Sequence, residues 1–158
     1  MDEEVTRVFA ALRDLPDFSG IDVTDINACG TDGGNALHYV VHGGDISAAK
    51  ALIDAGIDVN KAGDLGYSPL HVACIKGNLD MVKLLVEKGA DLFALSEGYP
   101  PFTNARSGGY DHICDFLAPL MEQMGSRDRK IWLKSRIAQL RREIADLEAR
   151  LDASDEPT

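Results

Sequence analysis

Apolar residues recur at helical spacing in several short segments of the chain, and glycines separate these segments. Residues 1–15 place five large apolar side chains on one helical face, namely Val5, Val8, Phe9, Leu12 and Leu15. Residues 79–88 direct Leu79, Met81, Val82, Leu84 and Leu85 largely toward one side. Helices this short are marginal alone, so the pattern predicts an all-α fold in which several of them pack together.

An internal repeat organises the middle of the chain. Gly33–His38 recurs as Gly66–His71, and His71 follows His38 by 33 residues. The same interval separates Gly44 from Gly77, Gly56 from Gly89, Asp58 from Asp91 and Asn27 from Asn60. A single repeat of this size cannot bury its apolar face alone, so the repeats are expected to stack into a solenoid.

Each repeat carries start and stop signals for a turn and two helices. Asn35 and Ser68 can cap the first helix, and Pro69 suits the first helical position, where no backbone donor is needed. Gly77 can end that helix in the left-handed conformation, and Gly89 ends the second helix.

In these positions the sequence resembles the ankyrin-repeat family. The family pattern of Gly, Thr-Pro-Leu-His, Ala-Ala, Gly and Leu-Leu is matched by Gly66, Ser68–His71, Ala73, Gly77, Leu84 and Leu85. The resemblance covers residues 27–94 and implies a short ankyrin-repeat solenoid that binds proteins and is not an enzyme.

The pattern weakens on both sides of the clear repeats. Gly98 follows Gly66 by only 32 residues, Thr103 replaces the motif histidine, and Pro100 has no side-chain oxygen to cap a helix. Residues 27–124 are therefore interpreted as two clear repeats and one degenerate closing repeat, whose Ile113, Phe116, Leu117 and Leu120 would cover the end of the stack. Residues 1–26 are expected to form a capping helix and an irregular connection.

A different pattern begins after a hinge at residues 125–129. Over residues 130–152, apolar residues recur at alternating intervals of four and three, at Leu133, Ile137, Leu140, Ile144, Leu147 and Leu151. This heptad repeat predicts a coiled-coil helix, followed by a disordered tail at residues 153–158. Pairing between two chains is the favoured interpretation, and folding back onto the repeats is the alternative.

Isoleucine at the a positions and leucine at the d positions favour a parallel two-stranded coil, but charge favours an antiparallel homodimer. A parallel pair would set Arg136 against Arg141 of the other chain and Glu143 against Glu148. An antiparallel pair would instead join Glu143 to Arg150 and Arg141 to Glu148. Residues 126–142 carry a net charge of +6 and residues 143–156 a net charge of −5, so antiparallel packing lays opposite charges together.

Composition narrows the classes of partner. The 158 residues include 26 acidic and 16 basic side chains, a net charge of −10 that repels nucleic acid. No run of about 18 apolar residues could cross a membrane, and no basic segment followed by an apolar run opens the chain. The odd number of cysteines, Cys29, Cys74 and Cys114, indicates reduced thiols and a cytoplasmic protein.

Candidate chemistry is sparse. His38 and His42 have a spacing that can chelate a metal, but the resemblance assigns His38 to hydrogen bonds within the turns. Cys74 and Cys114 fit packing positions, and neither a phosphate-binding glycine loop nor a catalytic grouping stands out. The chain is expected to need no cofactor or metal.

The resemblance also implies a binding surface in two parts. The first, here called the hairpin ridge, comprises Asp32, Gly34, Asp64, Leu65, Tyr67, Glu97 and Tyr99 at the turns. The second, the inner face of the short helices, comprises His42, Ile75, Lys76 and Ser107. Tyr67 and Tyr99 should stand in a row as binding anchors, unless each packs on its own hairpin.

Two functions remain open at this point. The favoured one is an oligomeric adaptor or scaffold whose partner is neutral or basic where it docks, because residues 1–125 carry a net charge of −11. The alternative is an immunity-type or inhibitor protein that occludes the active surface of a basic toxin or nuclease.

Overall fold

The computed structural model describes residues 3–20, 22, 25–124, 137, 141 and 144 of the chain. These residues are helical or irregular, apart from isolated β-bridges between Cys29 and Asn35 and between Ser96 and Tyr99. The elements in chain order are α1 (Glu3–Arg13), η1 (Pro16–Phe18), α2 (Ala36–Gly43), α3 (Ile46–Asp54), η2 (Asp64–Gly66), α4 (Pro69–Lys76), α5 (Leu79–Glu87), α6 (Pro101–Ser107) and a further helical segment at residues 111–124. The predicted all-α class is confirmed.

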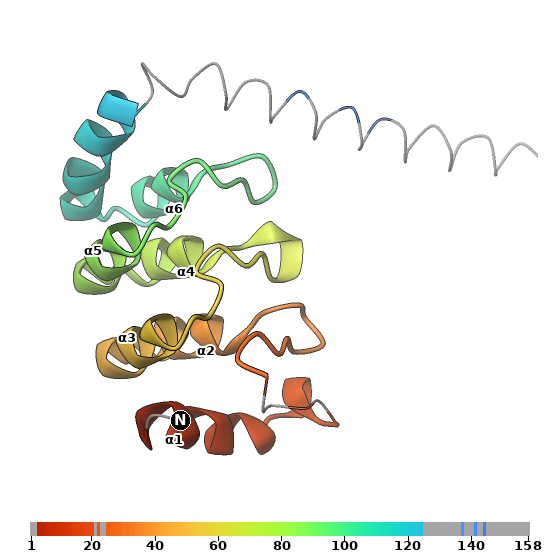
Figure 1. Cartoon of the computed structure of the whole chain (residues 1–158). Helices are drawn as coiled ribbons and strands as arrows, with labels where there is room; N and C mark the ends of the chain where they lie inside the picture. Colours follow the sequence, from red (N-terminus) through yellow and green to blue (C-terminus); the bar gives the residue numbers. More distant parts are fainter. Residues whose placement is uncertain are drawn as a thin grey trace, which may run out of the picture. The chain divides into compact units, whose positions relative to one another are not determined.

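The chain divides into two compact units, Met1–Ala118 and Pro119–Thr158. Within the first, α2 pairs with α3 and α4 pairs with α5. The short helices also contact one another, α2 with α4 and α4 with α6, so the pairs are layered one above another (Figure 1). The loops between pairs project on the side of α2, α4 and α6 (Figure 1).

Side-chain caps begin these helices and left-handed glycines end them, as predicted at Asn35 and Gly77. The Asn35 side chain accepts a hydrogen bond from the backbone N–H of Leu37, while Asn78 accepts one from Met81 at 3.0 Å. Gly44 and Gly77 end α2 and α4 with φ values of 76° and 69°. Glycine adopts this left-handed conformation with little strain, which explains the abrupt stops.

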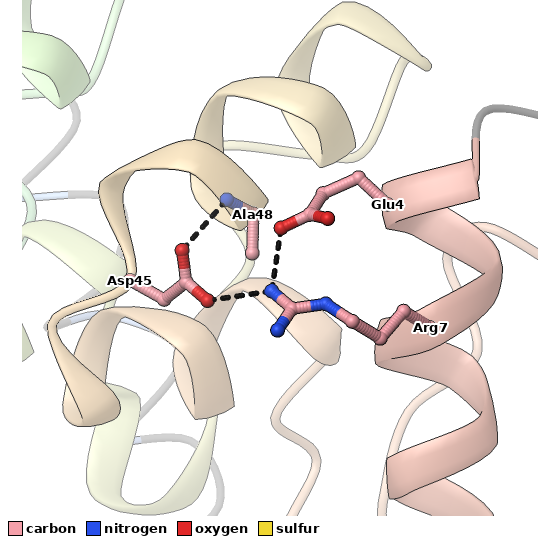
Figure 2. A network of polar contacts seen from close by, with 4 residues as sticks. All are labelled: Glu4, Arg7, Asp45 and Ala48. Atoms are coloured by element: carbon pink, nitrogen blue, oxygen red, sulfur yellow. Dashed lines mark hydrogen bonds and ion pairs between the residues drawn. The ribbon is translucent and has the colours of Figure 1, made fainter.

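Helix α1 covers the side of the first repeat that faces away from the second repeat (Figure 1). Val5, Val8, Phe9 and Leu12 are buried, and α1 contacts both α2 and α3. Arg7 adds a polar link, because its guanidinium lies 2.8 Å from a carboxylate oxygen of Asp45, the residue that caps α3 (Figure 2). The other Asp45 oxygen accepts the N–H of Ala48, and this hydrogen bond is the main cause that lowers the pKa of Asp45 (Figure 2).

The core of the stack lies where successive pairs meet. Leu37, Leu52, Leu70, Met81 and Leu85 are completely buried. In α5 the apolar face is narrower than the sequence pattern indicated, since Leu79 and Leu84 are only half-buried.

The closing repeat is one residue shorter because its turn is tighter. In the second hairpin, Gly63 N donates to Tyr67 O at 2.9 Å across three intervening residues. In the third, Ser96 and Tyr99 exchange backbone hydrogen bonds of 3.0 and 2.8 Å across Glu97 and Gly98 alone. This difference accounts for the interval of 32 residues from Gly66 to Gly98.

Tyr110 occupies the place before the last described helix where Asp45 and Asn78 cap α3 and α5. Its ring lies against two glycines, and a β-carbon would lie 2.4 Å from the ring if added at Gly77 and 2.5 Å if added at Gly108. Ring packing therefore replaces a side-chain cap in the closing repeat. Beyond Tyr110, Ile113 and Leu117 are buried and Phe116 is half-buried.

The predicted coiled-coil segment lies mostly outside the described residues. Ile137, Arg141 and Ile144 are helical, and the two isoleucine side chains are 48% and 53% exposed. Leu133, Leu140, Leu147 and Leu151 lie outside the described residues, as do the hinge at residues 125–129 and the tail at residues 153–158. Among the described helices, none has the length and apolar character needed to cross a membrane.

Candidate protein-binding surface

Histidines tie the second and third hairpins to the helix of the repeat before each of them. His38 Nδ1 accepts the backbone N–H of Asn35 at 3.2 Å, so the ring proton sits on Nε2, which donates to Tyr67 O at 3.0 Å. His71 repeats the arrangement with Ser68 N at 3.1 Å and Tyr99 O at 3.2 Å. Burial lowers the pKa of both imidazoles and so favours the neutral form that these bonds require.

Asparagines connect the repeats at a second line of contacts. Asn27 Oδ1 accepts the N–H of Asp58 and Asn60 Oδ1 accepts the N–H of Asp91, both at 2.8 Å. Phe93 stands at the next position of this 33-residue series, and the side-chain ladder ends there. The hairpins thus extend from repeats that are joined by two sets of hydrogen bonds, one made by the histidines and one by the asparagines.

The three hairpins form one continuous ridge. Gly63 approaches Gly34 so closely that a β-carbon on Gly63 would lie 3.3 Å from the Gly34 Cα. Gly66 lies similarly close to Leu95 O, and Ser96 Oγ donates to Leu65 O at 2.9 Å. Side chains at the turns are therefore held in a row at fixed spacing.

Most of the predicted binding residues are exposed. On the hairpin ridge these are Asp32, Asp64, Leu65, Glu97 and Tyr99, and on the inner face His42, Ile75, Lys76 and Ser107. Leu65 and Tyr99 are each 60% exposed and Ile75 is 44% exposed. Tyr67 is half-buried and Gly34 is buried.

The two ridge tyrosines have different surroundings. The Tyr67 ring meets His71 edge-on, with ring centroids 5.7 Å apart. Thr103 stands four residues after Tyr99, where His71 stands after Tyr67, so Tyr99 has no corresponding imidazole to pack against. Tyr67 therefore packs within its own repeat, whereas the Tyr99 side chain is 60% exposed.

Two turn residues adopt a conformation that usually belongs to glycine. Leu65 has a φ of 52° and Glu97 a φ of 50°. A left-handed backbone at a residue with a β-carbon costs about 1–2 kcal/mol, and such costs are found most often at functional sites. At Leu65 this conformation holds an apolar side chain in solvent at the tip of the second hairpin.

The structure adds Tyr39, which the sequence pattern did not single out. Its side chain is 44% exposed on α2, and it lines two adjoining hollows beside the N-terminal cap, of about 380 and about 420 Å³. Tyr39 lies one position after the motif histidine. The heptad and repeat patterns carry no signal for its exposure, which depends on how the cap is placed.

The residues considered as candidates for catalysis or metal binding lie where they serve the fold. His38 uses both ring nitrogens in hydrogen bonds within the stack. Burial raises the pKa of the Cys74 thiol to about 12, so it is a poor nucleophile at neutral pH. In the part of the chain that the structure describes, no group of three or more His, Cys, Asp or Glu side chains is placed to hold a metal ion.

Comparison with known proteins agrees with this geometry. A family model described as ankyrin repeats, in three copies, matches residues 10–96, more than half of the chain. The match begins within α1 and ends at the third hairpin. No curated protein matches the chain.

Proposed function

The chain belongs to the ankyrin-repeat family, whose repeats are protein–protein interaction modules, and we propose that it is an adaptor or scaffold that binds a partner protein. The proposed contact surface consists of the hairpin ridge and the inner face of the short helices. Ridge residues from successive turns would meet the partner together, because the turns contact one another directly.

The observation that carries this proposal is the exposure of large apolar side chains on a rigid support. Leu65 and Tyr99 are 60% exposed at neighbouring turns, and Leu65 keeps its place at the cost of a strained backbone. An aromatic ring that is already held in position loses little entropy on binding, so Tyr99 is the strongest anchor candidate on the ridge.

The charge of the repeats indicates the chemistry of the partner. Residues 1–125 carry 19 acidic and 8 basic side chains. Asp32, Asp64 and Glu97 lie along the ridge itself and are exposed. We infer a partner that is neutral or basic where it docks, and an association that weakens as salt rises.

The C-terminal heptads support self-association in this proposal. An antiparallel homodimer through residues 130–152 would give each assembly two copies of the ankyrin surface, so that one cytoplasmic scaffold could hold two partner molecules. The exposed Ile137 and Ile144 side chains are consistent with such a seam.

The acidic surface also favours a second candidate, an immunity-type inhibitor that occludes the active surface of a basic toxin or nuclease. The two functions differ in the effect that binding has on the activity of the partner. An inhibitor abolishes the activity of its partner at one-to-one stoichiometry, whereas an adaptor leaves that activity in place.

The experiment that tests the proposal compares ridge variants against a partner isolated from native lysate and then purified. Tyr99→Ala should weaken binding by about 1–3 kcal/mol without lowering the melting temperature. Leu65→Gly should weaken binding and leave stability unchanged or raised, because glycine accepts the left-handed backbone. Calorimetric titration gives the affinity and circular dichroism the melting temperature.

Ile46→Ala is the matched control, since Ile46 is an exposed aliphatic residue on α3, away from the ridge. It should bind as the unaltered protein does. Binding that is unchanged in both ridge variants, or a melting temperature that falls in step with affinity, would mean that the ridge residues support the fold and do not bind the partner.

A further inference from the structure

Two adjoining hollows lie where the N-terminal cap meets the first repeats. Tyr39 and His42 line both of them. The hollow of about 380 Å³ reaches from Leu15 and Phe18 of the cap connection to the second hairpin, and the hollow of about 420 Å³ lies between α1 and α2. Together they form a surface, here called the cap groove, of a size that suits side chains of a bound segment.

The first hollow combines three carboxylates with apolar and aromatic walls. Asp17, Asp32 and Asp64 contribute the carboxylates, and no lysine, arginine or histidine among the described residues forms an ion pair with them. Asp17 accepts one hydrogen bond from Thr31 Oγ1 and Asp32 one from Gly34 N, so acceptor capacity remains on both.

The walls of this hollow include Phe18, Tyr39, Tyr67 and Val72. An arginine side chain matches such a site better than any other common residue. Its apolar stem can lie along the wall, and its planar guanidinium can stack on an aromatic ring while it donates to carboxylates. Lysine would supply the charge but not the planar donor fork.

The second hollow has a different chemistry. Its one arginine, Arg7, is already neutralised by Glu4 and Asp45 (Figure 2). The rest of its wall includes Val8, Ala11, Val40 and the Tyr39 ring. This hollow therefore suits an aliphatic or aromatic side chain.

We propose that the cap groove binds a segment of the partner that places an arginine in the first hollow and an apolar side chain in the second, with the Tyr39 ring between them. This inference rests on the proposed protein-binding function and assigns to it a subsite at the cap end of the proposed contact surface, which shares Asp32 and Asp64 with the hairpin ridge. The cap connection then contributes directly to recognition through Asp17 and Phe18, in addition to covering the stack.

The test uses random short-peptide libraries on a solid support, probed with the fluorescently labelled full chain. One library fixes arginine at its centre, and a matched library fixes citrulline, which keeps the shape and loses the charge. The arginine library should retain at least about tenfold more protein, with apolar residues enriched at one constant offset from the arginine.

Protein variants then locate the site. Asp32→Asn/Asp64→Asn removes two charges but keeps an oxygen that can accept from Gly34 N, and it should abolish the preference for arginine over citrulline. Asp58→Asn/Asp91→Asn removes two charges from aspartates that line neither hollow and that accept the backbone N–H two residues on, as Asp32 does, and it should keep that preference. Melting curves of both pairs establish that each is folded.

Tyr39→Ala should reduce retention of the arginine library by at least about tenfold, whereas Tyr99→Ala should leave it unchanged. Equal retention of the arginine and citrulline libraries overturns the inference, and so does an arginine preference that survives Asp32→Asn/Asp64→Asn. In either case a partner whose binding depends on Tyr99 leaves the proposed function standing, so the two failures are distinguishable.

Discussion

A neutral imidazole joins the repeats at each junction of the stack. His38 and His71 each accept a backbone N–H of their own repeat and donate to a carbonyl of the next hairpin. Protonation of the ring would remove the acceptor and place a charge in a partly buried site. The same two residues therefore position the binding surface and make its stability depend on pH.

The direction of this dependence follows from the shifted pKa values. Because the pKa of each histidine is lowered from 6.5 in the folded state, their contribution is present above pH 6.5 and is lost as pH falls through the folded-state pKa. Between the folded-state pKa and the unfolded-state value of 6.5, each histidine lowers the free energy of unfolding by up to about 1.4 kcal/mol for each unit that the pH falls. Urea denaturation between pH 7.5 and 5 measures this loss.

Two matched double variants test whether His38 and His71 cause this pH dependence of stability. His38→Gln/His71→Gln should be less stable at pH 7.5 and should lack this part of the pH slope. His42→Gln/His112→Gln, at exposed positions, should keep it. Equal slopes in the two variants would show that the imidazoles of the stack do not control the transition.

At the scale of elements, α1 is held to the first repeat by an apolar face and by one exposed ion-pair network. Val5 and Leu12 on the apolar face of α1 are completely buried. The Arg7 guanidinium is solvent-exposed although it contacts both Glu4 and Asp45 (Figure 2). Exposed pairs contribute little compared with buried apolar area, so the apolar face should dominate the attachment.

Two single substitutions separate these contributions. Leu12→Ala should lower the free energy of unfolding by about 2–5 kcal/mol, because it leaves a cavity between α1 and the first repeat. Arg7→Ala should change stability little and should reduce its dependence on salt. Urea denaturation at low and high ionic strength measures both, and a larger loss for Arg7→Ala would contradict this account.

At the scale of the whole molecule, charge is distributed unevenly along the chain. The repeats are strongly acidic, whereas residues 126–142 are basic and residues 143–156 are acidic again. In the proposed antiparallel dimer each basic half lies against an acidic half of the other chain. Reversing several weak pairs from repulsion to attraction can decide between orientations whose apolar seams are nearly equal.

Cross-linking tests this orientation. A single cysteine is inserted directly after residue 152 in a variant whose Cys29, Cys74 and Cys114 are replaced by alanine. The dilute protein is then oxidised. We expect dimeric mass by light scattering and little cross-linking between the two added thiols. Efficient cross-linking would indicate a parallel pair, and a monomeric mass would indicate that the helix does not pair between chains.

The sequence by itself determined the repeat period, the helix ends and the all-α class. These properties depend on local chemistry, such as the caps at Asn35 and Ser68 and the left-handed stop at Gly77, and local chemistry can be read from neighbouring residues. It also placed Leu65, Tyr99 and Ile75 at exposed positions, because the repeat pattern gives each residue a register.

The tertiary structure decided what each of those positions contacts. It placed Tyr67 against His71 but left Tyr99 open, and it set Tyr39 between two hollows that exist only because the cap folds back beside the first repeat. Such hollows are formed by residues far apart in the chain, whose distances depend on packing between elements. Sequence periodicity specifies which face of a helix is exposed, but only the packed structure specifies what stands opposite that face.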